Sequence, residues 1–367
     1  MEENLKKTCL YDSHVAAGAK MSPFAGFMMP IQYTTITDEH NAVRNHVGMF
    51  DVSHMGEIFV SGPDAEKFVN HIFTNEIRGF EAGKVLYGMM LHENGGVVDD
   101  LLVYREFEPD HFLLVVNAAN IDKDYEWIKS QAAGFDVVVV NDSDNWGQIA
   151  VQGPEAEKIV TEVLGLKEAA ELAFYTYYET KWNGHRMVVS RTGYTGEDGF
   201  ELYATPEDIV NLWQILKDAG VVMCGLGCRD TLRFEAGLPL YGDELSDTIT
   251  PVEAGLGMFC KLDKEFIGRD ALVKQKAEGP AKKLVGIELQ DKAIPRATYP
   301  VETEDGTQIG VVTTGYHSIT LDKSICSPNK ASKYFLSNID IFVKALWSIL
   351  KKGWLSLNIN FWKHWSL

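Results

Sequence analysis

The sequence has no apolar run of the eighteen or more residues that a membrane-spanning helix requires. Its first residues, MEENLKKT, contain no apolar segment of the kind that a signal peptide carries. Positive charge is scarce as well, because 34 lysines and arginines stand against 52 aspartates and glutamates and leave a net charge of −18. These absences predict a cytoplasmic protein without a membrane span. They also argue against nucleic acid or an anionic membrane as the main partner.

Cysteine is also rare, and the five cysteines are Cys9, Cys224, Cys228, Cys260 and Cys326. An odd number of scattered cysteines is typical of a reducing compartment, in which thiols stay free. Cys224 and Cys228 could be half of a metal site, but no second pair of cysteines lies near them. The prediction is therefore two small core residues and no metal site.

One succession of sequence signals occurs twice in the chain. Residues 56–63 read GEIFVSGP and residues 147–154 read GQIAVQGP, so each is a short apolar strand that ends in Gly-Pro. The apolar spacing after each strand predicts a half-buried helix. The expected buried face of the second helix comprises Ala156, Ile159, Val160, Val163 and Leu164.

Each copy continues with a hairpin, a strand and a second helix. Residues 94–95 and 183–184 both read Asn-Gly between strand-like runs, and this dipeptide is the strongest short hairpin signal. A strand that leads into a helix then begins at Phe112 in the first copy and at Phe200 in the second. The predicted fold class is therefore α+β, with two related units that have antiparallel sheets and helices on one face.

A length of 367 residues is too great for one ordinary core and favours two or three domains. The first α+β domain is expected at 1–55 together with 141–280, and the second at 56–140. Residues 281–326 contain short alternating strands with glycine turns, which predicts a small C-terminal β-barrel. Residues 327–367 are expected to be an atypical tail that leaves this barrel incomplete.

The composition changes after Cys326, because Asp340 is the only acid between residues 327 and 367. Residues 341–357, IFVKALWSILKKGWLSL, could form a basic amphipathic helix on a membrane or a partner. The favoured alternative is that the tail is not a selected segment, as out-of-frame translation near the end of a gene would produce. Four of the eight tryptophans lie there: Trp347, Trp354, Trp362 and Trp365.

Long motifs run through residues 8–326. They are GAKMSPFAGFMMPIQY (18–33), VGMFDVSHMGEIFVSGP (47–63), NGGVVDDLLVYR (94–105), VVNAANIDKD (115–124), SRTGYTGEDGFEL (190–202) and GLGCRDTLRFEAGLPLYGDEL (225–245). In these motifs the chain resembles the T-protein family of the glycine cleavage system, which are aminomethyltransferases. The tail is the departure from this resemblance, since the family continues with further barrel strands.

The resemblance implies two α+β domains and a C-terminal barrel around a central folate channel, with folate bound mainly by the domain at 1–55 and 141–280. It implies tetrahydrofolate as co-substrate, no metal, and the lipoylated H-protein as partner. The one-carbon unit of aminomethyl-dihydrolipoyl H-protein would pass to tetrahydrofolate. The products would be 5,10-methylenetetrahydrofolate, ammonia and dihydrolipoyl H-protein.

Such a transfer needs a fixed carboxylate, because positive charge builds up on the transferred carbon and on the attacking folate nitrogen. Asp99 and Asp100 are adjacent on an expected strand and therefore face opposite sides. Apolar residues flank both, so periodicity leaves the choice between them open. The resemblance implies that Asp100 is the catalytic residue.

Folate also offers groups that charged side chains recognise. The pteridine ring has an amino group beside an N–H, and a carboxylate accepts hydrogen bonds from both. The resemblance assigns this role to Glu201, while Glu197 and Asp198 in the same glycine-rich loop are expected to be solvated.

Two arginines are candidates for the anionic glutamate end of folate. Arg229 and Arg233 are four residues apart, hence on one helical face, where like charges repel unless an anion lies between them. Pairing with Asp230 or Glu235 is the alternative. The resemblance implies substrate binding by Arg229, and it adds four further channel residues: Asn117, Tyr87, Met55 and Tyr194.

Three alternatives stay open beside the transferase. A folate-binding assembly factor for iron–sulfur proteins shares the implied fold, but its loop carries a cysteine where residues 191–195 read RTGYT. A folate domain of a larger demethylating dehydrogenase would come with a dinucleotide fingerprint, which the sequence lacks. The third alternative is an inactive transferase whose barrel is spoiled by the altered tail.

Overall fold

The structure is a computed structural model that describes residues 5–289, 293–303 and 306–331. The chain divides into two compact units. The first comprises residues up to 72, 76–88 and 101–232, and the second comprises 73–75, 89–100 and the residues from 233 onward. The chain passes between the units within strands β5 (Val85–Leu91) and β6 (Val97–Arg105).

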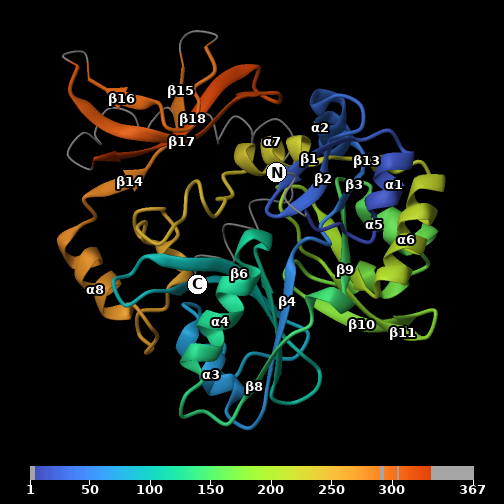
Figure 1. The fold of residues 1–367 in the computed structure, drawn as a ribbon, viewed down its shortest axis with the longest axis horizontal. Helices are drawn as coiled ribbons and strands as arrows, with labels where there is room; N and C mark the ends of the chain where they lie inside the picture. The colour runs from blue at the N-terminus through green and yellow to red at the C-terminus, as the bar shows by residue number, and fades with distance from the viewer. Residues whose placement is uncertain (1–4, 290–292, 304–305, 332–367) are drawn as a thin grey trace. The chain divides into compact units, whose positions relative to one another are not determined.

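A six-stranded sheet lies in the first unit, with the strand order β10-β11-β12-β9-β3-β13 (Figure 1). Strand β13 runs parallel to β3, and the other neighbouring strands are antiparallel. The strands are β3 (Gly48–Asp51), β9 (Gly147–Gln152), β10 (Tyr177–Trp182), β11 (His185–Ser190), β12 (Gly199–Ala204) and β13 (Val222–Met223).

A five-stranded sheet has the order β5-β6-β7-β4-β8. Its pairs β6–β7, β7–β4 and β4–β8 are antiparallel. The strands not yet given are β4 (Gly56–Ser61), β7 (His111–Val116) and β8 (Val138–Asn141). These three strands lie within the predicted second domain, 56–140, except that β8 ends one residue beyond it. The domain division itself stays a prediction.

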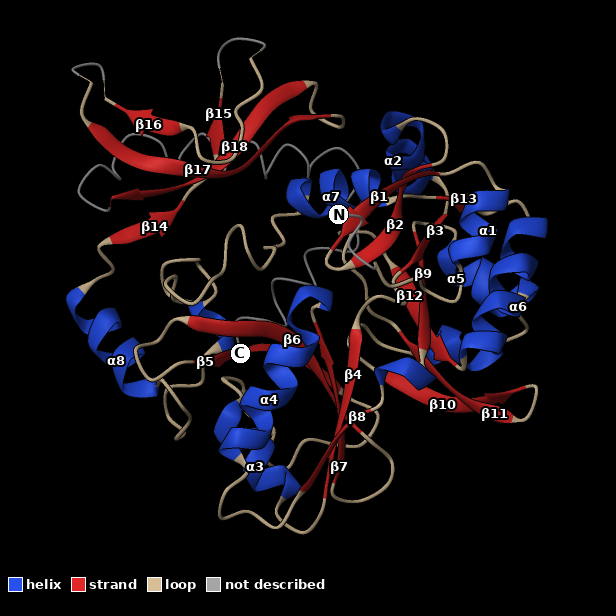
Figure 2. Ribbon diagram, in the orientation of Figure 1, coloured by secondary structure: helices blue, strands red, loops and turns tan. Residues whose placement is uncertain are grey.

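Helices cover one face of each sheet (Figure 2). Helix α6 (Pro206–Asp218) buries Leu212 and Trp213 in the core of the first sheet. Thr205 is its N-cap, because the Thr205 side chain accepts a hydrogen bond from the backbone N–H of Asp208. Helices α3 (Ala65–Ile72) and α4 (Ile121–Gln131) contact strands β4, β7 and β8 of the second sheet.

The two sheets confirm the predicted duplication. The succession β10-β11-β12-β9 of the first sheet matches β5-β6-β7-β4 of the second, strand for strand. The glycine after each repeated strand has the same positive φ, +126° at Gly62 and +128° at Gly153. The predicted hairpin between β10 and β11 forms a turn with positive φ at both Asn183 and Gly184, as a type I′ turn requires.

One predicted helix differs from the expectation. After GQIAVQGP the chain forms the short α5 (Ala156–Lys158) and continues as a π-helical turn over Ile159–Val163. The wider π turn changes which side chains face the sheet. Ala156 and Val160 are buried as predicted, whereas Val163 is exposed.

The faces of the two sheets opposite these helices share one cluster of buried side chains. Tyr104, Leu113 and Val115 come from the second sheet, and Val188 and Tyr203 come from the first. The duplicated halves are therefore joined by an apolar layer with tyrosine hydroxyls inside it.

The second unit has its own apolar core, which includes Met89, Val97, Leu245 and Leu272. Its C-terminal sheet has the order β14-β18-β17-β16, and β15 also pairs with β18. Helix α8 (Arg269–Glu278) precedes this sheet. The strands of the sheet are β14 (Lys282–Leu284), β15 (Ile287–Glu288), β16 (Pro300–Glu302), β17 (Gln308–Ser318) and β18 (Lys323–Ala331).

Strand β18 corrects the predicted start of the tail. It continues five residues past Cys326, where Asn329 of β18 pairs with Val311 of β17 and Ala331 of β18 pairs with Lys282 of β14. Residues 327–331 therefore belong to the barrel sheet, because they supply pairing partners to strands on both sides. The predicted amphipathic helix at 341–357 and the four tail tryptophans lie outside the described residues.

Several elements remain to be placed. Two helices and a hairpin precede β3, and α7 follows β13. Their bounds are α1 (Tyr11–Ala16), β1 (Lys20–Phe24), β2 (Phe27–Gln32), α2 (Ile36–Asn45) and α7 (Leu226–Glu235). None of the helices in the described part of the chain is long and apolar enough to cross a membrane.

Candidate functional site

Glu201 lies in the middle of β12 and is buried. Its Oε1 accepts a hydrogen bond of 3.0 Å from the Gln148 side chain, and its Oε2 accepts a short one from the Thr192 hydroxyl. Burial raises the pKa of Glu201, while the bond from Thr192, the charge of Arg229 and the bond from Gln148 act against that rise. These two donors fix the orientation of the Glu201 carboxylate, which can then accept hydrogen bonds from a pair of N–H groups on a ligand.

Arg229 is partly exposed on α7, and its guanidinium lies 4.4 Å from the ring centre of Tyr194. This is a close cation–π contact, and the ring holds the cation in place. The charge of Arg229 also acts on Glu201 and on His54. The structure thus brings together three of the predicted site residues: Glu201, Arg229 and Tyr194.

His54 belongs to the same neighbourhood, although no sequence argument singled it out. Its ring makes edge contacts with Phe24 and Phe27, and its Nδ1 is buried without a hydrogen-bond partner among the described residues. Burial, and after it the charge of Arg229, lowers the pKa of His54 to about 4. His54 is therefore neutral at pH 7.

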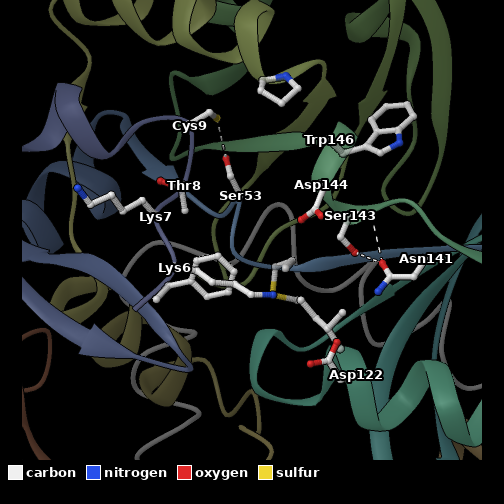
Figure 3. A pocket seen from close by; sticks show the side chains of 14 residues that line it. Lys6, Lys7, Thr8, Cys9, Ser53, Asp122, Asn141, Ser143, Asp144 and Trp146 are labelled. Atoms are coloured by element: carbon white, nitrogen blue, oxygen red, sulfur yellow. Dashed lines mark hydrogen bonds between the residues drawn. The ribbon is translucent and has the colours of Figure 1, made fainter. Parts of the chain in front are cut away.

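Met55 follows His54 and lines a cavity of about 350 Å³ in the first unit (Figure 3). Side chains from the N-terminal segment, including Lys6 and Cys9, lie on its wall. Cys9 approaches Ser53 at 3.8 Å. Burial and the charge of Asp51 raise the pKa of Cys9 to about 12, so its thiol stays protonated and is not a nucleophile.

Asn117 and Tyr87 lie on the second sheet. Asn117 directly follows β7 and precedes a 3-10 turn, where its carbonyl accepts a hydrogen bond from the backbone N–H of Asn120 at 2.9 Å. Tyr87 lies in β5, and both side chains are partly exposed. Their backbone places Asn117 at the end of a strand, a position from which functional side chains often act.

The two aspartates in β6 differ in burial. Asp99 is fully buried, and Asp100 is partly exposed. Because successive residues of a strand face opposite sides, Asp100 shares its face with Leu102 and Tyr104. The sequence left the choice between the two aspartates open, and the exposed fraction favours Asp100 as the one that meets a substrate.

Arg233 differs from the binding role expected from its spacing. It is only 1% exposed, and its guanidinium donates to Glu244 at 2.7 Å and to the carbonyl of Leu238 at 3.2 Å. A second carboxylate oxygen, Oδ2 of Asp243, lies 3.3 Å from Nη2 of Arg233. The alternative of ion pairing is therefore what the structure contains, although with Glu244 and Asp243 in place of Asp230 or Glu235.

Glu197 and Asp198 are not the solvated carboxylates that the glycine-rich loop suggested. Glu197 is 8% exposed in its side chain and pairs with Arg44 at 2.9 Å. Asp198 pairs with Arg191. The two ion pairs fasten the loop that carries Thr192 and Tyr194, although the Asp198 side chain keeps 27% of its surface exposed.

Comparisons with known proteins show which family the chain belongs to. The GCVT N-terminal domain family matches residues 10–264, and the glycine cleavage T-protein C-terminal barrel domain family matches residues 282–327. The chain belongs to the glycine cleavage T-protein family. The resemblance seen in the sequence motifs is thus confirmed, and the barrel match extends one residue beyond the predicted tail boundary.

Relatives of this family match nearly the whole chain. The aminomethyltransferase of Lysinibacillus sphaericus is 53% identical over 321 residues, which cover 86% of this chain and 87% of that protein. The aminomethyltransferase of Alkaliphilus oremlandii is 50% identical over 326 residues, or 88% of each chain. The crystal structure of glycine cleavage system aminomethyltransferase T from Bartonella henselae matches with a TM-score of 0.84 at 33% identity, covering 90% of this chain and 91% of that one.

The structure also contains a buried acid that the sequence motifs did not single out. Gln148, which bonds to Glu201, is the second residue of GQIAVQGP, and Glu57 is the second residue of GEIFVSGP. Glu57 is fully buried, and burial together with the charge of Asp142 raises its pKa well above the ordinary value. The sequence did contain a signal for this buried acid, because both apolar strands carry a polar residue at their second position.

We expect Glu57→Gln to stabilise the protein increasingly as the pH rises. A carboxyl whose pKa is raised in the folded state binds more protons there, so stability is lost as the pH climbs from about 4.5, the ordinary value, through the folded pKa. The amide has no charge to desolvate and should gain roughly 1–3 kcal/mol at pH 8. Urea unfolding at pH 5 and pH 8 measures this gain. The control Glu207→Gln, at an exposed position, should show none, and an equal effect in both variants would contradict the prediction.

Proposed function

We propose that this chain transfers the one-carbon unit of aminomethyl-dihydrolipoyl H-protein to tetrahydrofolate and releases ammonia, 5,10-methylenetetrahydrofolate and dihydrolipoyl H-protein. The observation that carries the proposal is the buried carboxylate of Glu201, in a chain whose nearly full-length relatives are named aminomethyltransferases. The cytoplasmic location expected from the cysteines is part of the proposal. All five cysteines carry free thiols.

In this proposal Glu201 and Arg229 hold the two ends of folate. Glu201 accepts hydrogen bonds from the amino group and the neighbouring N–H of the pteridine, because an acceptor pair matches a donor pair. Arg229, held by the Tyr194 ring, pairs with the anionic glutamate end. Met55, Asn117 and Tyr87 are proposed as further contacts with folate. The buried ion pair of Arg233 leaves that arginine out of the proposal.

Asp100 is proposed as the catalytic carboxylate. Two folate nitrogens bond in turn to the carbon of an S–CH2–NH3+ group: the first displaces ammonia, and the second displaces the sulfur, which leaves with a proton as the thiol of dihydrolipoyl H-protein. In the first displacement, positive charge passes through that carbon to the attacking folate nitrogen. A fixed negative charge lowers the energy of this state more than that of the separated substrates, and the same carboxylate can accept and hand on the proton that leaves the folate nitrogen.

Removing the charge of Glu201 tests the binding part of the proposal. We expect Glu201→Gln to weaken tetrahydrofolate binding by roughly 1–3 kcal/mol, the scale of a hydrogen bond to a charged group. Titration calorimetry under reducing conditions measures the affinity. Glu207→Gln removes an exposed acid nearby and should leave the affinity unchanged.

A shortened ligand separates the two ends of the site. Tetrahydropteroate lacks the glutamate end, so Arg229→Ala should weaken tetrahydrofolate but leave tetrahydropteroate nearly unaffected, while Glu201→Gln should weaken both. Unchanged affinity for tetrahydrofolate in both variants would contradict the proposed binding mode. A rise in the thermal midpoint of the full chain with tetrahydrofolate would argue against the alternative of an inactive, tail-altered transferase.

A further inference from the structure

A continuous row of buried hydroxyl groups leads from Glu201 to the layer between the two sheets. Thr192 donates to Glu201, and the Oγ atoms of Thr192 and Ser190 lie 3.0 Å apart. Tyr104 donates to Ser190 at 3.2 Å, and the hydroxyls of Tyr104 and Tyr203 lie 3.0 Å apart. All these residues belong to the first unit, and every one of the four hydroxyl residues is at most 1% exposed.

Each hydroxyl has one hydrogen, and this fixes the direction of the chain. The hydrogen of Thr192 points to the carboxylate of Glu201, so Ser190 must supply the hydrogen between Ser190 and Thr192. Tyr104 donates to Ser190, so Tyr203 must supply the hydrogen between the two tyrosines. The donors therefore run from Tyr203 through Tyr104, Ser190 and Thr192, and they all end on Glu201.

A one-way chain of donors favours the charged form of the group at its end. Each hydroxyl polarises the next, and hydrogen bonds in a low-dielectric interior strengthen one another. Burial acts to raise the pKa of Glu201 and therefore favours its protonated form. A protonated acid would present an O–H to a pteridine edge that itself carries only donors. The site therefore needs a device that keeps this buried carboxyl ionised and correctly turned.

We propose that Thr192, Ser190, Tyr104 and Tyr203 form a hydroxyl chain that holds Glu201 ionised and oriented for ligands with an amino group beside a ring N–H. These four are positioning residues, because they act through Glu201 and not on the ligand. The inference rests on the proposed role of Glu201 in pteridine binding. It gives the site a preference by chemical class: 2-amino-4-oxopteridines and rings with the same donor edge.

Other charged groups near Glu201 do not replace the chain. Arg229 on α7 contributes a positive charge, and the Gln148 side chain on β9 donates to the other oxygen. The titratable groups that interact with Glu201 from β6 and β12 are Tyr104 and Tyr203, which stay neutral because burial raises the pKa of both. Among the residues that the structure describes, Thr192 is the one that donates a hydrogen bond to Oε2.

Removing the first link tests the proposal. Thr192→Val keeps the shape of the side chain and deletes the hydroxyl. We expect about a tenfold loss of tetrahydrofolate affinity at pH 7, the scale of one charge-assisted hydrogen bond. Affinity should also begin to fall at a higher pH than in the wild type when the pH is lowered from 8.5 to 6. Thr192→Ser restores a hydroxyl and should recover both the affinity and the pH profile.

A second variant keeps the test valid if Thr192→Val does not fold. Tyr104→Phe removes an inner link and should shift the same pH profile upward by a smaller amount. Tyr178→Phe is the matched control, because the Tyr178 hydroxyl is buried without a partner among the described residues and lies outside the chain. The inference would be overturned if the pH dependence of tetrahydrofolate affinity were the same in Tyr104→Phe and Thr192→Val as in Tyr178→Phe.

Failure of the inference and failure of the proposed function give different results. If Glu201→Gln leaves tetrahydrofolate affinity unchanged, the pteridine role of Glu201 is wrong and the inference falls with it. If Glu201→Gln weakens binding while Thr192→Val matches the wild type at every pH, the binding role stands and the hydroxyl chain alone is wrong.

Discussion

Replacing Asp100 by asparagine is expected to lower turnover about 100-fold while tetrahydrofolate affinity changes by no more than a few-fold. The asparagine keeps the size of the side chain but lacks the negative charge that stabilises the cationic state of the reaction. Binding survives because folate is held at its two ends by other groups in the proposed site. Single-turnover formation of methylenetetrahydrofolate from aminomethyl-dihydrolipoyl H-protein measures the chemical step directly.

The neighbouring aspartate is the matched control. Asp99 is fully buried, and its strand position puts it on the face opposite Asp100. Asp99→Asn should therefore change the free energy of unfolding more than the rate of the chemical step. A greater loss of turnover in a folded Asp99→Asn protein than in Asp100→Asn would show that the catalytic assignment belongs to Asp99.

The duplicated fold could be predicted because its signals are local. The repeated apolar strands and the Asn-Gly turn at residues 183–184 each depend on residues within a few positions of one another. Such short-range patterns keep their meaning wherever the segment lies in the fold. The same reasoning identified the α+β class and the order of the elements in both halves.

The errors arose where long-range contacts decide the outcome. Glu197 lies in a glycine-rich loop, but it is buried by Arg44, which is more than 150 positions earlier in the chain. The end of β18 depends on pairing with β14 and β17, and the composition after Cys326 concealed that pairing. A π-helical turn exposed Val163 although its spacing suits a buried face.

The same limit applies to the hydroxyl chain. Tyr104 and Ser190 are 86 positions apart, and they meet only because the two sheets pack face to face. Neither residue has a chemical type or a spacing that separates it from an ordinary strand residue. Glu201 itself was assigned from its motif, while the groups that act on its charge come from strands β6, β9 and β11, from the loop that carries Thr192 and from helix α7.

The largest effect on stability is expected from Arg233→Ala. The guanidinium of Arg233 and the carboxylate of Glu244 are both buried, and Thr314 and Thr313 also donate to that carboxylate. Burial raises the pKa of Glu244, but the charge of Arg233 and these hydrogen bonds outweigh it and hold the pKa below the ordinary value. Removing the arginine leaves a buried charge without its partner, which costs about 3–5 kcal/mol.

Hydrogen exchange in β17 is the appropriate measurement, because Thr313 and Thr314 connect that strand to Glu244. Exchange of the β17 amides in Arg233→Ala should be faster by roughly two to three and a half powers of ten, which corresponds to that free energy. Because the pKa of Glu244 is lowered in the folded state, the stabilisation is present above the ordinary pKa of about 4.5 and is lost as the pH falls through the folded value. The difference between wild type and variant should therefore shrink in acid. The control is Arg229→Ala, because Arg229 is on the same helix but partly exposed, and it should leave the β17 amides protected from exchange. If the β17 amides were equally protected in Arg233→Ala, the ion pair with Glu244 would not stabilise the barrel sheet.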